Sequence, residues 1–284
     1  MKRICLIQLD GKMPNLALMK LSAWHRARGD DITLIDMSGL KFDRVYASKV
    51  FAGGTGIDLK SELPDEIEAV APDYDRFKTD FSIGFSSRGC IRDCGFCIVR
   101  EKEGYIREAG MNWIKHSKII LLDNNFLASP EWREKLQYFI DNKIKTNFNQ
   151  GLDLRLIDKE KAKMLSKVLY YDRKFKSRYI YFAWDNIEDE LVIREKLKLL
   201  LKYIPNRHVM VYILCGYNTN EEEDLHRYHV LWGEFGVLPY VQIYNNVPNP
   251  RLHLFAKWIN KRVHKKYSWE SWLTRTQPHP KECD

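Results

Sequence analysis

Long apolar runs are missing from this sequence. No stretch approaches the roughly 20 residues that a membrane-spanning helix requires. The opening segment, MKRICLIQLDGK, has basic residues and an apolar run, but that run is too short for a signal peptide and ends at Asp10. We therefore expect a cytoplasmic protein without a membrane partner. In a reducing compartment, clustered cysteines more often bind a metal or carry out redox chemistry than form disulfides.

An excess of acidic residues is also missing. Lysine and arginine number 46 against 38 aspartates and glutamates, which gives a net charge of +8 over 284 residues. A basic balance favours phosphate-rich partners such as a nucleotide or nucleic acid. Ordinary surface charge is the alternative, because many enzymes without such partners carry a similar excess. Hydrophobic residues make up 45% and charged residues 30%, which is a soluble globular composition.

The first 77 residues predict a small Rossmann-like α/β domain. Apolar runs at 3–9 and 31–37 indicate buried strands, and residues 15–30 between them have apolar side chains at helical spacing. A third strand is expected at 43–51. A short helix and a linker rich in proline and aspartate follow at 62–77, so we expect a domain boundary there.

From residue 78 onward the chain alternates strand and helix patterns. The predicted strands lie at 81–86, 118–123, 145–150, 178–184, 208–215 and 239–244. The predicted helices lie at 131–142, 158–168, 187–203, 220–234 and 252–266. This alternation predicts parallel strands joined by crossover helices. The fold class is therefore α/β, with a partial (β/α)6 TIM-like barrel over 78–248, and an open doubly wound sheet is the alternative.

Three of the six cysteines lie within eight positions, in the segment GFSSRGCIRDCGFC (84–97). Cys90, Cys94 and Cys97 have the spacing C-x3-C-x2-C, and a chance match is on the order of one in a few hundred. Structural zinc usually requires four ligands. Here no histidine follows, and Cys5 and Cys215 lie in apolar runs typical of core residues, while Cys283 belongs to a polar tail. Three thiolates suit a [4Fe–4S] cluster with one iron left open to a small molecule.

With this motif the sequence resembles the radical S-adenosylmethionine superfamily, in which C-x3-C-x-Φ-C carries an aromatic residue, here Phe96. The resemblance implies a [4Fe–4S] cluster that binds S-adenosylmethionine and an electron donor such as flavodoxin or ferredoxin. It implies an enzyme that cleaves this cofactor reductively and abstracts a hydrogen from a substrate with the resulting 5′-deoxyadenosyl radical. By this resemblance Phe96 would pack near the adenine, and a role as a buried loop anchor is the alternative.

The ends of the later strands carry polar residues that resemble family positions. Asp123, Asn124 and Asn125 are candidates to bind the methionyl amine, or else form a turn that caps the strand. Asp185 is a candidate for the ribose hydroxyls, with the N-cap of the next helix as the alternative. Gly216 would permit close approach of the backbone, in the family to the adenine.

The segment NQGLDLRL ends the third predicted strand of this region. Gln150, Asp153 and Arg155 are expected to point into the barrel. Arg155 suits a carboxylate because its guanidinium offers forked donors. An internal salt bridge between Asp153 and Arg155 is the competing interpretation.

The N-terminal domain resembles the cobalamin-binding domain of one branch of this family, with Gly53 and Gly54 after a strand. The D-x-H-x-x-G signature of that domain is absent, because LDGKMPNLALM contains no histidine. We therefore expect a degenerate domain and regard cobalamin as an unlikely cofactor. A cobalamin-dependent methyltransferase stays an alternative.

The segment 249–284 is basic and aromatic. It predicts either a helix that binds a phosphate backbone or single-stranded base, or an amphipathic helix that closes the barrel with its aromatics and exposes its lysines. A non-catalytic zinc-binding module that recognises nucleic acid is the rival to the enzyme. A second basic run, RKFKSR at 173–178, is typical of a solvated loop.

Overall fold

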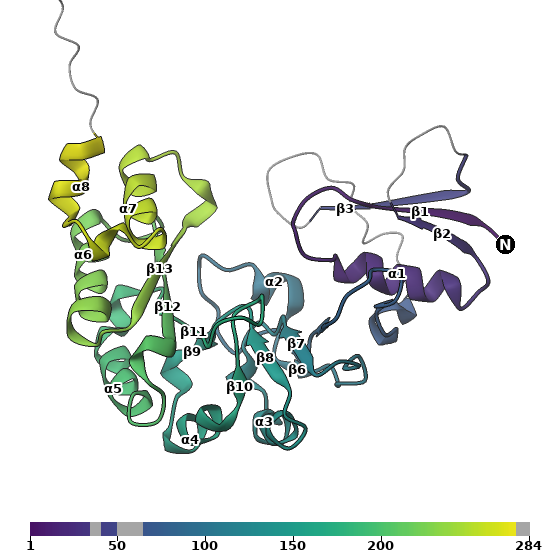
Figure 1. The fold of residues 1–284 in the computed structure, drawn as a ribbon, viewed down its shortest axis with the longest axis horizontal. Helices are drawn as coiled ribbons and strands as arrows, with labels where there is room; N and C mark the ends of the chain where they lie inside the picture. Colours follow the sequence, from purple (N-terminus) through teal and green to yellow (C-terminus); the bar gives the residue numbers. More distant parts are fainter. Residues whose placement is uncertain (35–40, 50–64, 277–284) are drawn as a thin grey trace, which may run out of the picture. The chain divides into compact units, whose positions relative to one another are not determined.

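The computed structural model describes residues 1–34, 41–49 and 65–276. The chain divides into two compact units (Figure 1). Unit 1 comprises Met1–Phe85 and Gly110–Leu121, and unit 2 comprises Ser86–Ala109 and Leu122–Asp284. The three-part division at 77 and 248 expected from the sequence stays a prediction. The glycine pair 53–54 and Cys283 lie outside the described residues.

Unit 1 begins with a small parallel α/β arrangement. Strand β1 (Arg3–Gln8) is followed by helix α1 (Leu16–Arg26), β2 (Asp31–Leu34) and β3 (Arg44–Ser48), and the sheet order is β2-β1-β3. The Asn15 side chain caps α1 by accepting a hydrogen bond from the Leu18 amide (3.2 Å). The core includes Ile4 and Leu6 of β1, packed against Leu18 of α1.

The rest of unit 1 contains a short 3-10 helix (Asp65–Ala69) and two further strands. Strands β4 (Ser82–Gly84) and β7 (Lys118–Leu121) pair in parallel. The Tyr74 hydroxyl donates to the Trp113 carbonyl (2.8 Å), so the linker is tied to the segment that precedes β7.

Unit 2 is built on parallel strands. Strands β9 (Leu152–Asp153), β11 (Ile180–Ala183), β12 (Val209–Cys215) and β13 (Leu238–Ile243) form a parallel sheet in the order β13-β12-β11-β9. Strands β8 (Lys145–Phe148) and β10 (Leu169–Tyr170) pair in parallel beside it. The pair β5 (Ser87–Arg88) and β6 (Arg107–Glu108) is antiparallel.

Seven α-helices are described in unit 2: α2 (Val99–Glu103), α3 (Trp132–Asp141), α4 (Lys159–Lys167), α5 (Glu190–Leu200), α6 (Glu221–Tyr228), α7 (Pro250–Asn260) and α8 (Trp269–Thr276). Several begin at side-chain caps, because the first backbone N–H groups of a helix lack partners. Asp158 caps α4, Asn220 forms a capping box with Glu223 at α6, and Asn249 precedes a proline at the start of α7.

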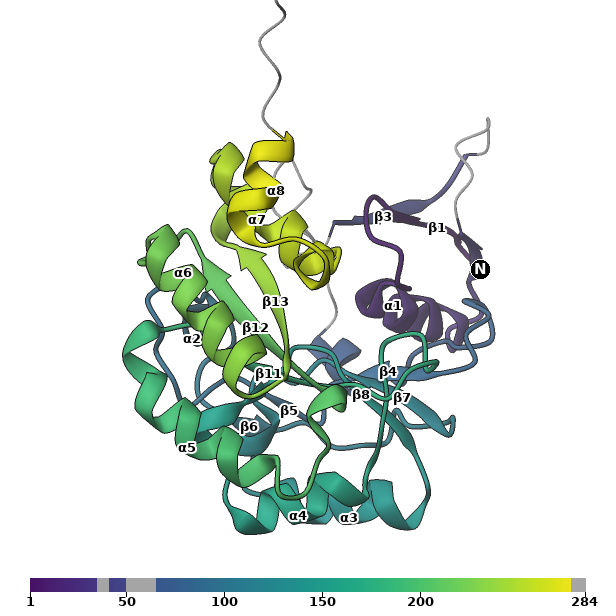
Figure 2. The same ribbon diagram turned by 60° about the vertical axis from the view of Figure 1, so that its left-hand side comes forward.

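The two faces of the β9–β13 sheet differ. Val209, Val211 and Ile213 of β12 are buried, whereas Met210 and Tyr212, which alternate with them, are partly exposed. Helices α5 and α6 lie together along one side of these strands (Figure 2). One face of the sheet is therefore packed, and the other remains partly open.

The α/β class with parallel strands is confirmed. The described strands form open sheets, and no closed barrel is found among them. Phe255, Trp258 and Trp269 of α7 and α8 are 2–3% exposed, while Lys257 is exposed. The expected amphipathic character, with buried aromatics and exposed lysine, is thus confirmed for these residues, which do not offer free faces to a base; closure of a barrel by this segment stays a prediction.

Within the described part of the chain, no helix has the length and apolar character needed to cross a membrane.

Candidate metal centre

The cysteine segment lies on a loop whose two ends are tied together. Strands β5 and β6 pair Ser87 with Glu108 and Arg88 with Arg107, and the Cys90 amide donates to the Gly104 carbonyl (3.2 Å). Gly89 has a φ of +80°, and a Cβ there would lie 2.2 Å from the Tyr105 carbonyl oxygen. Only glycine fits this position, so the turn that presents Cys90 depends on it.

Asp123 anchors the start of this loop. Its carboxylate accepts hydrogen bonds from the amide and hydroxyl of Ser86 (2.7 and 2.6 Å) and from those of Ser87 (2.8 and 2.6 Å). Burial raises the pKa of Asp123, and these hydrogen bonds act in the opposite direction. The bonds match the alternative of a structural turn, and the expected contact with a methionyl amine stays a prediction.

The two asparagines after Asp123 contact the cysteine loop itself. Asn124 Oδ1 accepts from the Gly89 amide (3.0 Å). Asn125 Nδ2 donates to Cys90 Sγ (3.4 Å) and to Asp153 Oδ2 (3.4 Å). The Oδ1 atom of Asn125 is buried without a hydrogen-bond partner in the protein, so a ligand could donate to it.

Asp153 joins the loop to the next strand end. Its carboxylate accepts from Arg92 Nε (3.1 Å), on the cysteine loop, and from Arg155 Nε (2.8 Å), which also bonds Asp189 through Nη1 (2.8 Å). Burial alone would raise the pKa of Asp153, but the two guanidinium groups outweigh it and hold this pKa below its ordinary value. The internal Asp153–Arg155 salt bridge is confirmed.

Asp185 follows β11 and is half-buried. Burial raises the pKa of its carboxyl to about 6, against the charges of Arg227 and Arg155, which lower it. The alternative that Asp185 caps the next helix is wrong, because Asn186 and Asp189 occupy the N-cap positions there. The carboxyl therefore remains a candidate for binding hydroxyl groups.

Aromatic rings pack beside the cysteines. The rings of Phe96 and Tyr217 meet edge to face at 5.6 Å, and Tyr217 meets Tyr244 at 4.9 Å. A Cβ on Gly95 would lie 2.6 Å from the Tyr217 hydroxyl. Phe96 is half-buried, less than the alternative of a buried loop anchor requires, and its contact with an adenine stays a prediction.

Gln150 and Gly216 contribute less to this arrangement. Gln150 is exposed in the turn after β8. Gly216 has a φ of +81°, and a Cβ there would lie 2.7 Å from a methyl of Leu252. The Leu252 side chain of α7 therefore lies close to Gly216, and the approach of this backbone to an adenine stays a prediction.

Sequence reasoning missed four contributors: Ser86, Ser87, Arg92 and Tyr217. The serines and Arg92 lie next to predicted residues, but their partners are 36–61 positions away in sequence, so no local pattern marks them. Tyr217 directly follows the predicted residue Gly216. An aromatic residue directly after a glycine at a strand end could have indicated this contributor.

The three thiols lie on one loop between β5 and β6. All three cysteines are partly exposed, and none of the five described cysteines is in a disulfide. Burial raises the pKa of Cys94, and the charges of Arg155, Cys97 and Cys90 also act on it. Among the described residues, no group of three or more His, Cys, Asp or Glu side chains is arranged to hold a metal ion. Three thiolates are chemically suitable ligands for an iron–sulfur cluster.

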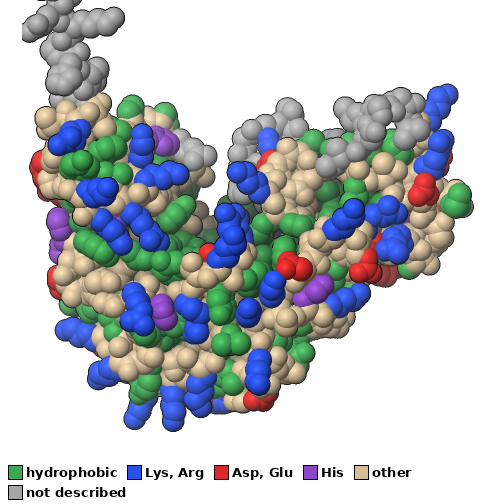
Figure 3. All heavy atoms as spheres, viewed as in Figure 1, with side chains coloured by type: hydrophobic (Ala, Val, Ile, Leu, Met, Phe, Trp, Pro, Cys, Tyr) green, Lys and Arg blue, Asp and Glu red, His purple; other side chains and the backbone are tan. Residues whose placement is uncertain are grey.

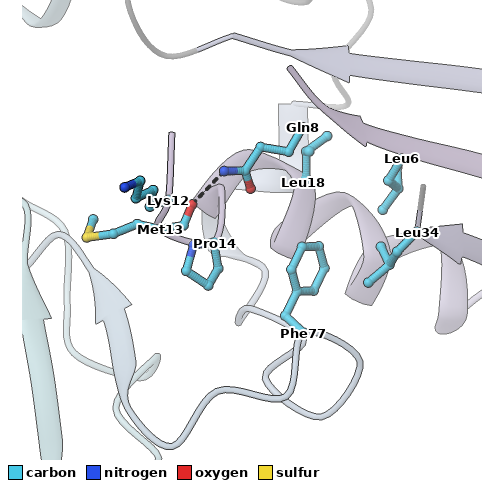
Figure 4. Close-up of a pocket in the computed structure, with 8 residues that line it drawn as sticks. All are labelled: Leu6, Gln8, Lys12, Met13, Pro14, Leu18, Leu34 and Phe77. Carbon is cyan, nitrogen blue, oxygen red and sulfur yellow. Dashed lines mark hydrogen bonds between the residues drawn. The ribbon is translucent and has the colours of Figure 1, made fainter. Parts of the chain in front are cut away.

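Unit 1 contains a cavity of about 250 Å³ at the end of β1 (Figure 4). It is lined by Leu6, Gln8, Lys12, Met13, Pro14, Leu18, Leu34 and Phe77. Gln8 Nε2 donates to the Met13 carbonyl (2.7 Å), which fixes the loop after β1. Lys12 stands two residues after Asp10, where the cobalamin signature has its histidine. This lining offers no imidazole to a cobalt ion.

No protein-family model matches the chain, and no curated protein matches its sequence.

Proposed function

We propose that the chain is a radical S-adenosylmethionine enzyme in which Cys90, Cys94 and Cys97 hold a [4Fe–4S] cluster. The observation that carries this proposal is the set of contacts around the cysteine loop. Residues that follow or end β7, β9, β11 and β12 converge on one loop with three thiols. Ligands of parallel α/β proteins bind at the carboxyl ends of their strands, which supports a shared site there.

A bound cluster of this kind would supply the electron that cleaves S-adenosylmethionine and so initiates hydrogen abstraction from a substrate. The chain's own residues would hold the loop and shape its surroundings. Asp123 and Asp153 fix the loop at two points, and the free Oδ1 of Asn125 could accept a hydrogen bond from a bound ammonium group. Asp185, partly exposed beside Cys94, could accept hydrogen bonds from ribose hydroxyls.

The finer fold assignment belongs to the same proposal. The strands of unit 2 and the helices beside them are compatible with a partial (β/α)6 TIM-like barrel, and the β2-β1-β3 sheet of unit 1 with a degenerate Rossmann-like domain. We infer that unit 1 does not use cobalamin, because Lys12 replaces the histidine of the signature. Titration of the purified protein with cobalamin tests this, since stoichiometric uptake would refute it.

Cofactor cleavage tests the function. Anaerobically reconstituted protein, given S-adenosylmethionine and dithionite, should form 5′-deoxyadenosine, and the Cys94→Ala variant should form none. Asp93→Asn is the matched control, because Asp93 is an exposed neighbour on the same loop. Product formation by Cys94→Ala at the wild-type rate would contradict the proposed function.

A further inference from the structure

Three tyrosines form a row across the open face of the β11–β12–β13 sheet. The ring centroids of Tyr181 and Tyr212 are 5.6 Å apart with planes at 19°, and those of Tyr212 and Tyr240 are 5.6 Å apart at 69°. Tyr240 lies directly opposite Tyr212 on β13, an edge strand, and is 39% exposed. A Cβ on Gly151 would lie 3.1 Å from the Tyr212 ring, so this glycine leaves room for the row. We call Tyr181, Tyr212 and Tyr240 the tyrosine row.

The row is a neutral surface with a cation beside it. Burial raises the pKa of Tyr181 to about 12 and also raises that of Tyr212, so both phenols stay protonated at neutral pH. The positive charge of Arg173 acts on both hydroxyls, and the negative charge of Asp172 acts more strongly on that of Tyr181. Uncharged rings next to a guanidinium suit an aromatic ligand that carries negative charge.

Arg173 belongs to a tight basic loop, residues 171–178, between β10 and β11. The Asp172 carboxylate accepts hydrogen bonds from the amides of Lys176 (2.8 Å) and Ser177 (3.2 Å), so the only acid of the loop is engaged with its backbone. Arg173, Lys174 and Lys176 are exposed, and none of them has an ion-pair partner among the described residues. Three cations thus lie on one loop, and one of them, Arg173, is close enough for its charge to act on the tyrosine row.

We infer that the tyrosine row and the basic loop bind single-stranded nucleic acid. An unpaired base would stack on Tyr240, the exposed end of the row, and phosphates would contact Arg173, Lys174 and Lys176. This combination of aromatic faces with cations is how proteins bind single strands without reading their sequence. A nucleoside monophosphate carries a single phosphate, which does not require three unpaired cations. In a duplex the faces of the bases are covered by neighbouring base pairs and could not stack on a tyrosine. The net charge of +8 favours a polyanion.

This inference goes beyond the proposed function, and the binding it describes is testable without iron. Metal-free, full-length protein is titrated into fluorescein-labelled 12-nucleotide single strands of mixed sequence, as DNA and as RNA, and anisotropy is recorded at several salt concentrations. The triple variant R173A/K174A/K176A should bind more weakly and lower the salt slope of log K by about 2, because each phosphate contact on a single strand contributes about 0.7.

The matched control is K163A/K167A/K198A, on the basic outer surface of α4 and α5 (Figure 3). This control also removes three positive charges from exposed positions, and it should leave the salt slope of log K unchanged. An equal decrease of the affinity and of the salt slope in both triple variants would mean that binding depends only on overall charge. That result would refute the proposed site.

Stacking is tested at Tyr240. Tyr240→Ala should weaken binding by about five- to 150-fold, the range measured for loss of one base–aromatic stack. Tyr240→Phe keeps the ring and should retain affinity. Tyr138→Ala on α3 removes an equally exposed tyrosine, 39%, and should have no effect. Circular dichroism confirms that each variant is folded.

Three results would overturn the inference: wild-type affinity in Tyr240→Ala, duplex binding as tight as single-strand binding, or equal competition by adenosine monophosphate. Cofactor cleavage is measured separately on reconstituted protein. Cleavage without oligonucleotide binding would refute the nucleic-acid site alone, and binding without cleavage would refute the proposed enzyme while leaving the nucleic-acid site standing.

Discussion

The anchor between Asp123 and the two serines gives a prediction that requires no cofactor. In Asp123→Asn, the remaining oxygen can still accept from the Ser86 amide, and the serine hydroxyls can turn. The new NH2 group, however, replaces the oxygen that accepts from the Ser87 amide (2.8 Å). That buried donor loses its partner at a cost of about 1–3 kcal/mol, and the lost charge assistance adds about 1 kcal/mol. We expect the loop to be destabilised by about 2–4 kcal/mol.

Hydrogen exchange measures this locally, which is useful because a chain with two compact units need not unfold in a single step. The peptide that contains Ser86 and Ser87 should exchange about 30- to 900-fold faster in Asp123→Asn, the factor that corresponds to 2–4 kcal/mol. Asp93→Asn makes the same chemical change at an exposed position and should leave exchange unaltered. Unchanged exchange in Asp123→Asn would refute the anchoring role.

Three further outcomes follow from the same contacts. Gly89→Ala should destabilise the loop by more than about 2 kcal/mol, because the added Cβ would overlap a backbone carbonyl. Gly104→Ala is the control: there is open space around this residue, so the substitution should cost only about 1 kcal/mol of backbone strain. Thermal unfolding of the two variants measures the difference. Arg92→Ala should change the free energy of unfolding by at most about 1 kcal/mol, because the Arg92–Asp153 ion pair is partly solvated. The reconstituted variant should nevertheless release its iron to a chelator several-fold faster than the wild type. An unchanged rate of release would argue against the tether to Asp153. Burial lowers the pKa of His264 to about 4. As the pH falls below 6.5, the unfolded chain therefore binds a proton at this residue before the folded chain does. The free energy of unfolding of the wild type should decrease by about 3 kcal/mol by pH 4. His264→Phe should lack this loss in urea titrations at several pH values, and an identical pH dependence would contradict the assignment.

Much of the secondary structure could be predicted from apolar spacing. Long, buried strands such as 209–215 and amphipathic helices such as 159–167 carry a strong periodic signal, and the structure has them within a few residues of the expected bounds. The two-residue strands β5, β6, β9 and β10 were missed, because two residues show no periodicity. Their pairing depends on partners elsewhere in the chain.

The candidate site shows the same limit. The cysteine spacing marks the loop from sequence alone, and Asp153 with Arg155 was correctly paired as one alternative. The partner of Arg92 could not be predicted, because it lies 61 positions away and the pairing exists only when β9 reaches the loop. Asp185 was misjudged as a possible cap because Asn186 and Asp189, equally suited to capping, compete within four residues.

The metal content of the reconstituted protein tests the central claim most directly. Wild type and Cys94→Ala are reconstituted with iron and sulfide without oxygen, and iron, sulfide and zinc are then measured together with a visible spectrum. The account predicts about four irons and four sulfides per chain in wild type, with broad absorption near 400 nm that is lost in the variant. One zinc and no iron in wild type would contradict it and favour a zinc-binding module.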